Sequence, residues 1–363
     1  MGLELNRRSF LKGTVAFGAV AAGGALAACS GNAAASGSAA SASAASAGAA
    51  SASAASASAA ALKVGDKLPQ APAVEYAADA LVSPDAEWEL VAHVPETGIL
   101  EGMNWHDGTL WFIDVASSRI FMLQDGEVVT VYEDPDHKAM PNGAKFIDDD
   151  TMLICDRALG LCSYTVSTGD YKVLTDSFEG QRFLGLNDLV LDGRGGAYFT
   201  DPGQSDYFNN VGSVYYVDYA SGDYSAIEKI VGQAAYPNGI TISPDGLFLY
   251  IAEFNTNSII LVPSKSYTDA KDTPYVFARF IGGHGPDGVL TDADGNVYAA
   301  HLNAKEVAVV DAAGWPRPAI RLPESATPLV SNLLIAEGYL YACEFGGQNI
   351  WRIPIDAQPN PIA

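Results

Sequence analysis

The chain contains 363 residues and carries a formal net charge of −23, with 43 acidic side chains against 20 basic ones. A surface of this sign repels the phosphate backbone, so no nucleic-acid partner is expected. The length is sufficient for a large hydrophobic core. Frequent Asp-Gly turns, without a long amphipathic helix pattern, predict an all-β domain.

Residues 1–28 are typical of an export signal. Arg7 and Arg8 lie in a stretch close to the twin-arginine pattern, and an apolar run from about residue 14 leads to Leu26-Ala-Ala-Cys29. This tetrad is similar to a bacterial lipoprotein box, which predicts that Cys29 is lipidated after cleavage. An uncleaved membrane anchor is the alternative. We expect an extracytoplasmic protein, exported by the twin-arginine pathway and attached to the bacterial cell membrane only through its lipid.

Residues 29–61 begin with the predicted lipidation site and continue almost entirely in Ala, Ser and Gly. This segment has no amphipathic face, so we interpret it as a disordered, flexible tether without chemistry of its own. The folded domain is expected over residues 62–363.

One short pattern recurs six times in the folded domain: a polar residue, an apolar strand, a turn and a second apolar strand. The polar residues that begin the copies are 41 to 51 positions apart and are Glu101, Asn142, Asn187, Asn238, Asp287 and Asn332. A period of about 40–50 residues with several strands in each unit is typical of a β-propeller. We predict a six-bladed β-propeller, whose ring closes when a strand within residues 87–94 joins the last blade.

A closed ring brings these leading residues to the central axis. Four of them, Glu101, Asn187, Asn238 and Asp287, offer carboxylate or amide oxygens, which are the ligands that Ca²⁺ prefers. We predict one divalent cation there, with Ca²⁺ favoured over Mg²⁺, Mn²⁺ or Zn²⁺; zinc is the least suited because the set contains no His or Cys. The competing interpretation is that Asn238 and Asp287, each followed by glycine, are ordinary turn residues.

The folded domain contains three cysteines in two different settings. Cys155 and Cys162 flank the turn of one predicted hairpin, where a disulfide and two buried thiols are both compatible with the sequence. Cys343 lies in an apolar strand and is expected in the core.

Several motifs together resemble one known family, the SMP-30/gluconolactonase/LRE-like family. The similarity extends over about residues 97–350 and is carried by Glu101-Gly-Met-Asn-Trp105, Leu110-Trp-Phe-Ile-Asp114, Asn187-Asp188, Tyr198-Phe-Thr-Asp-Pro202, Pro237-Asn-Gly239 and Pro286-Asp-Gly288. The resemblance implies a six-bladed propeller with one divalent cation, usually Ca²⁺, on its axis. It also implies that Glu101, Asn238 and Asp287 are direct ligands.

The resemblance assigns further roles beside the cation. Asn187 matches an asparagine that ligates the metal or contacts substrate, and Asp188 matches the acidic residue next to it. Two departures weaken any inference about a sugar substrate: Gly185 stands where some members have Arg, and Cys155-Asp-Arg-Ala-Leu-Gly160 replaces an arginine-rich stretch. Arg157 is therefore the remaining basic substrate contact that we expect, together with Asn142.

The function expected from these residues is metal-dependent hydrolysis of a sugar-acid or similar lactone. The cation would polarise the lactone carbonyl, and Asp287 or Asp188 would act as general base toward water. His284 and His301 are weaker candidates for the base, because a loop or buried strand position explains each of them. The alternatives are hydrolysis of another small-molecule ester, such as an organophosphate, and a non-catalytic surface-tethered propeller that binds a sugar or protein ligand.

Overall fold

The computed structural model describes residues 80–268 and 274–363. The predicted signal sequence, the lipidation of Cys29 and the tether lie outside the described residues and stay predictions. Among the described residues, no helix has the length and apolar character that a membrane crossing requires.

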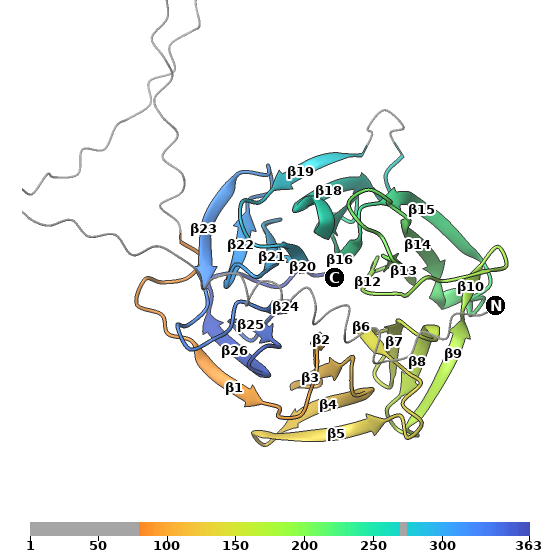
Figure 1. The fold of residues 1–363 in the computed structure, drawn as a ribbon, viewed down its shortest axis with the longest axis horizontal. Coiled ribbons are helices and arrows are strands. Elements are labelled where there is room, and N and C mark those ends of the chain that lie inside the picture. The colour runs from red at the N-terminus through yellow and green to blue at the C-terminus, as the bar shows by residue number, and fades with distance from the viewer. Residues whose placement is uncertain (1–79, 269–273) are drawn as a thin grey trace, which may run out of the picture. The chain divides into compact units, whose positions relative to one another are not determined.

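The described residues form six four-stranded antiparallel sheets arranged around a central axis (Figure 1). Blade one contains β2 (Leu100–His106), β3 (Thr109–Asp114), β4 (Arg119–Gln124) and β5 (Glu127–Glu133). Blade two contains β6 (Pro141–Phe146), β7 (Thr151–Asp156), β8 (Gly160–Thr165) and β9 (Asp170–Thr175). Blade three contains β12 (Leu189–Leu191), β13 (Gly196–Asp201), β14 (Gly212–Asp218) and β15 (Ile227–Ala234), and follows a small hairpin of β10 (Ser177–Phe178) and β11 (Gln181–Arg182).

The last three blades follow the same plan. Blade four contains β16 (Pro237–Ile242), β17 (Phe248–Glu253), β18 (Ser258–Pro263) and β19 (Tyr275–Arg279). Blade five contains β20 (Gly285–Thr291), β21 (Val297–Leu302), β22 (Glu306–Val310) and β23 (Pro316–Arg321). Blade six contains β24 (Val330–Ala336), β25 (Tyr339–Glu344), β26 (Asn349–Pro354) and β1 (Glu89–His93), and short 3₁₀ turns occur at η1 (Tyr219–Ser221) and η2 (Phe254–Thr256).

The ring is closed by strand β1, which comes from the start of the described chain and pairs with β26 in blade six. Leu90 lies opposite Trp351 in this antiparallel ladder. Each innermost strand also contacts the innermost strands of the two neighbouring blades. The predicted six-bladed propeller and its closure through residues 87–94 are therefore confirmed.

The core consists of apolar layers between neighbouring blades. Phe112 and Phe121 of blade one, for example, pack in one cluster with Tyr341 and Cys343 of blade six. The blade faces also separate the other two cysteines: Cys155 packs toward blade three and Cys162 toward blade one. Because their side chains lie on opposite faces of blade two, no disulfide forms, and all three described cysteines are buried free thiols.

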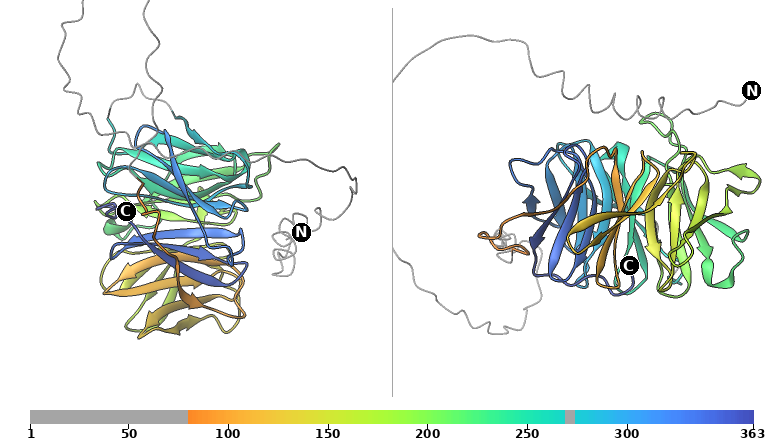
Figure 2. Two further views of the ribbon diagram at one scale, coloured as in Figure 1. Left: turned by 90° about the vertical axis from the view of Figure 1, so that its left-hand side faces the viewer. Right: turned by 90° about the horizontal axis from the view of Figure 1, so that it is seen from below.

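The two ends of the propeller differ. The innermost strands all begin at one end, which we call the upper face, where Leu100 of β2 lies opposite Asp114 at the end of β3. The chain continues past blade six to the opposite end, where the Asn360 amide donates hydrogen bonds to Ile242 O and Thr291 Oγ1, both at 2.6 Å. Figure 2 shows the C-terminus at that end, away from the face seen in Figure 1.

A carboxylate at the end of the second strand holds the upper-face loops in five of the six blades. The residues at this position are Asp114, Asp156, Asp201, Glu253, His301 and Glu344 in chain order. Asp114 Oδ1 accepts the N–H groups of Gly98, Ile99 and Ala116 at 3.0, 3.0 and 3.1 Å. These buried acids stabilise loops that would otherwise leave donors unpaired. Blade five differs because His301 occupies the position.

A candidate metal-binding site on the propeller axis

The six leading residues of the repeat all lie where the innermost strands begin. Glu101, Asn238 and Asp287 are the second or third residues of β2, β16 and β20, and Asn187 lies two positions before β12. Only 7% of Glu101 is exposed to solvent, and the three asparagines among the leading residues of blades two to four are similarly buried. The side chains of four separate blades therefore gather at one end of the axis.

Asn238 and Asp287 are strand residues, so their interpretation as ordinary turn residues is wrong. The glycines that follow the leading residues have a different role, since each lies against the next innermost strand. A Cβ atom on Gly239 would lie 2.5 Å from the carbonyl oxygen of Asp287, and one on Gly143 would lie 2.6 Å from Asp188 Cα. The missing side chains allow the strands to approach closely enough for the leading residues to meet.

This close approach predicts a large stability effect at Gly143. Replacement by Ala forces β6 away from Asp188, and we expect the free energy of unfolding to fall by about 3 kcal/mol, the upper end of the typical cost of overpacking. Urea denaturation measures this loss. Gly232→Ala is the matched control, because its Cβ would meet only Lys229 Cδ at 3.8 Å, and a change within about 0.5 kcal/mol is expected there. Equal stabilities of the two variants would contradict the packing argument.

Asn332, the leading residue of blade six, orients Glu101. Its Nδ2 donates a hydrogen bond to Glu101 Oε2 at 2.8 Å, while its Oδ1 accepts the N–H of Met103 at 3.3 Å. The amide is thus fixed in one orientation, and the backbone of Gly102 also hydrogen-bonds to the Glu101 carboxylate. The sequence placed Asn332 in the repeat, but nothing in it indicated this role.

Asp188 and Thr200 connect blade three to blade four at the site. Asp188 Oδ1 accepts the N–H of Leu189 at 2.8 Å, and its Oδ2 accepts the N–H of Ile240 at 3.3 Å. Thr200 Oγ1 donates to Asn238 O at 2.7 Å and accepts the N–H of Asp188 at 3.0 Å. These bonds hold Asp188 and Asn238 side by side.

Burial raises the pKa of all three carboxylates of the site, and repulsion between acids adds to this for two of them. Burial, and then the charges of Asp287 and Asp188, hold the pKa of Glu101 well above its usual range. Burial also raises the pKa of Asp287 to about 7, with a smaller contribution from Asp188 and against the lowering effect of the Asn238 hydrogen bond. The pKa of Asp188 rises to about 6 through burial. Three like charges that are largely removed from water in one place are unfavourable unless a positive charge accompanies them.

The donor set fits a hard divalent cation. Glu101, Asp287, Asn187 and Asn238 supply carboxylate and amide oxygens, and a cation among them would turn the mutual repulsion of the acids into attraction. Among residues 80–268 and 274–363, no three His, Cys, Asp or Glu side chains have the arrangement of a metal centre. That finding does not decide the matter, because two of the four predicted ligands are asparagines, and the cation stays a prediction.

The predicted substrate contacts lie around the same end of the axis. Asn142 Oδ1 is buried and accepts no hydrogen bond from the described residues, so it is a polar atom that a ligand could satisfy. Arg157 Nη2 lies 3.5 Å from Tyr236 Oη of blade four, and its charge acts on Asp287. His301, one of the two weaker candidates for the base, is only 1% exposed. It lies behind the loop that contains the other candidate, His284.

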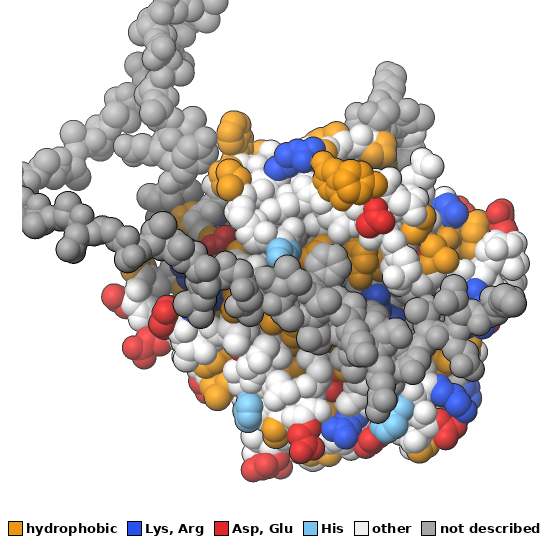
Figure 3. All heavy atoms as spheres, viewed as in Figure 1, with side chains coloured by type: hydrophobic (Ala, Val, Ile, Leu, Met, Phe, Trp, Pro, Cys, Tyr) orange, Lys and Arg blue, Asp and Glu red, His pale blue; other side chains and the backbone are white. Residues whose placement is uncertain are grey.

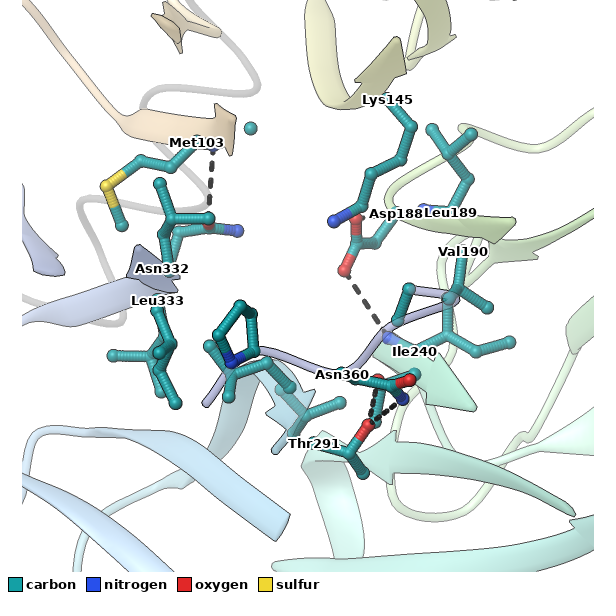
Figure 4. Close-up of a pocket in the computed structure, with 18 of the residues that line it drawn as sticks. Met103, Lys145, Asp188, Leu189, Val190, Ile240, Thr291, Asn332, Leu333 and Asn360 are labelled. Atoms are coloured by element: carbon teal, nitrogen blue, oxygen red, sulfur yellow. Dashed lines mark hydrogen bonds between the residues drawn. The ribbon is translucent and has the colours of Figure 1, made fainter. Parts of the chain in front are cut away.

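Beside Asp188, the axis contains a cavity of about 60 Å³ (Figure 4). Asp188 and Asn332 lie on opposite sides of it, Lys145 points toward Asp188, and Asn360 of the C-terminal segment also lines it, near Ile240 and Thr291. Burial lowers the pKa of Lys145, and the charge of Asp188 opposes that effect. Sequence reasoning missed both Lys145 and the C-terminal segment as parts of the axis.

A family model described as the SMP-30/gluconolactonase/LRE-like region matches residues 99–335. The chain belongs to this family. The family predicted from the sequence motifs is therefore confirmed. Among curated relatives, a lactonase drp35 of Staphylococcus epidermidis is 30% identical over 236 residues, which cover 62% of this chain and 70% of the relative. A lactonase drp35 of Staphylococcus aureus is 30% identical over 233 residues, with the same coverage.

Solved structures share the fold of this family member. A gluconolactonase from Xanthomonas campestris superposes with a TM-score of 0.64 at 22% identity, covering 77% of this chain and 93% of that protein. A calcium-binding regucalcin from Agrobacterium tumefaciens gives a TM-score of 0.62 at 20% identity, covering 74% and 94%. At these identities the likeness establishes the propeller architecture alone.

Proposed function

We propose that this protein is a lactone hydrolase with a divalent cation, most simply Ca²⁺, held by Glu101, Asn187, Asn238 and Asp287. The observation that carries the proposal is the meeting of three carboxylates, one buried and two partly buried, at the end of the axis, where burial raises the pKa of each. Relatives named lactonase and the family as a whole support the reaction class. Sugar-acid lactones are one substrate group that this chemistry admits.

When bound, the cation would polarise the lactone carbonyl and stabilise the negative charge that develops on its oxygen. Side chains of the protein transfer the protons and orient the substrate. Asp188 or Asp287 accepts a proton from water as the water oxygen bonds to the carbonyl carbon. The bond between the carbonyl carbon and the ring oxygen then breaks, and the same carboxyl returns its proton to the departing alkoxide. Asn142 and Arg157 are positioned to orient the lactone.

Removal of divalent cations tests the proposal. Turnover of a lactone panel, including glucono-δ-lactone, is expected to fall by a factor of about 1,000 or more after exhaustive chelation, because the carbonyl loses several kcal/mol of charge stabilisation. Addition of CaCl₂ should restore it, while circular dichroism confirms that the fold persists throughout. Lactone turnover that survives chelation would rule the mechanism out, and calorimetric binding without any turnover would favour a non-catalytic propeller.

A further inference from the structure

The upper face carries four strongly exposed apolar side chains in the loops around the site. Of the nine large hydrophobic side chains that are exposed among the described residues, Phe208 and Ile281 are the most exposed, at 94% and 96%. Leu184 and Tyr207 are the other two on this face; the remaining five are on outer strands or, for Trp315, at the opposite end. We call Leu184, Tyr207, Phe208 and Ile281 the apolar collar. Figure 3 looks onto this face and shows hydrophobic side chains gathered over the region of β13–β18.

The loop that presents two collar residues is tightly organised. It connects β13 to β14 over residues 202–211, whereas the equivalent loops of the other blades have three or four residues. Asp206 Oδ1 accepts the N–H groups of Phe208 and Asn209 at 2.8 and 2.9 Å. Ser205 Oγ accepts the N–H of Val211 at 3.0 Å. These bonds fix a turn whose tip holds Tyr207 and Phe208 in water, an arrangement that costs free energy without a ligand.

A single turn of blade four joins this loop to the one that carries Ile281. Asn255 Nδ2 donates a hydrogen bond to Ser205 O at 3.1 Å, and Asn257 Nδ2 donates to Gly282 O at 2.7 Å. The second bond matters because blade five has His301 in place of the carboxylate that holds the corresponding loop in the other blades. The two loops are therefore fixed relative to each other from a common support.

Leu184 connects the collar to the neighbourhood of the carboxylate site. A Cβ on Gly203 would lie 2.8 Å from Leu184 Cβ, and one on Gly185 would lie 3.5 Å from Arg157 O. Arg157 in turn contacts Tyr236, whose ring lies 5.8 Å from that of Phe254 in the same blade-four turn. A substituent that extends from a substrate at the carboxylates past Arg157 would thus reach apolar side chains.

We propose that the apolar collar binds a hydrocarbon substituent of the substrate, so that the preferred lactones carry an alkyl chain or aromatic group rather than sugar hydroxyls. This inference rests on the proposed lactone hydrolysis. The occupant is the substrate itself, because the collar loops lie on the same face as the carboxylates, beside Arg157, and are held in place by hydrogen bonds. Each methylene that leaves water on the collar should raise kcat/KM, up to about fourfold for complete burial.

The experiment compares δ-lactones with the same ring and different substituents, using calcium-loaded protein. We expect δ-decalactone, with a pentyl chain, to exceed δ-hexalactone, with a methyl group, by about 15-fold or more in kcat/KM, at about twofold for each partly buried methylene. Glucono-δ-lactone should be the poorest of the three. In Phe208→Ser and Ile281→Ser variants, the ratio of the two alkyl lactones should fall below about threefold.

Trp315→Ser is the matched control, because it also removes an exposed apolar side chain, 58% exposed, but at the opposite end. Its ratio of kcat/KM for δ-decalactone to kcat/KM for δ-hexalactone should equal that of the wild type. A wild-type ratio near one, or a preference for glucono-δ-lactone, would overturn the collar inference and leave the hydrolase proposal intact. Hydrolysis of none of these lactones would overturn both. An equal fall in the ratio for Trp315→Ser would also contradict the collar.

Discussion

Replacement of Asp287 by Asn is expected to lower kcat for lactone hydrolysis by a factor of about 1,000 or more and to abolish Ca²⁺ binding. Asn has almost the same shape, so the strand and the contact with Gly239 are retained, but one of the two predicted carboxylate ligands is lost. Loss of a general base alone typically reduces the rate 10²–10⁴-fold, and weaker charge stabilisation by the cation adds to this. Steady-state kinetics and isothermal titration calorimetry with CaCl₂ measure the two effects.

Asp294→Asn is the matched control for this substitution. Asp294 belongs to the turn between β20 and β21, at the opposite end of the same blade, and is exposed. It should retain both turnover and Ca²⁺ affinity. An Asp287→Asn variant that binds Ca²⁺ as tightly as the wild type would remove Asp287 from the ligand set.

Replacement of Glu101 by Gln is expected to stabilise the metal-free protein while eliminating its stabilisation by Ca²⁺. The buried carboxylate is unfavourable beside Asp287 and Asp188, as its raised pKa indicates. The glutamine side chain would be neutral, and its amide oxygen could still accept the hydrogen bond from Asn332. At pH 8 without metal we expect the melting temperature to rise by about 3–6 °C, which corresponds to roughly 1–2 kcal/mol for a domain of this size.

The stability of the metal-free protein is expected to depend on pH, and the raised pKa values of the site fix the sign of that dependence. The folded-state pKa of Asp287 is about 7, above the ordinary carboxylate value of about 4, so between these limits the folded protein binds more protons than the unfolded chain. The stability of the metal-free wild type should therefore fall as pH rises from about 4 to 7. Glu101→Gln should weaken that fall, whereas Glu127→Gln, at an exposed position of β5 in the same blade, should not. A metal-free Glu101→Gln protein that melts below the wild type would contradict the repulsion argument.

The blade pattern could be predicted because its signals are local. Turns such as Pro244-Asp-Gly246 stand between apolar strands at a regular spacing, and the structure has β16 and β17 on either side of this turn. The closing strand was predictable for a different reason. The last repeat supplies only three strands to its sheet, and the segment before the first repeat has the apolar pattern of the missing outer strand.

The inner surface of the axis could be predicted only in part. The register shifts at or beside the leading residue in five innermost strands, as between Pro141 and Ala144 in β6. A bulge of this kind interrupts the alternation of side chains, so strand periodicity could not place Lys145 beside the axial cavity. Contacts such as that of Arg157 with Tyr236 join residues 79 positions apart, and no local pattern in the sequence encodes them.

Because β1 pairs with β26, the ring cannot close until the end of the domain has been synthesised. Glu89 is among the first residues of the domain to leave the ribosome, yet its partner Arg352 is among the last. Until then every nascent chain exposes two unpaired sheet edges, which are sites for aggregation, and the ladder that joins them has a very large sequence separation. The two edges of the open ring therefore find each other only when translation of the domain is almost complete.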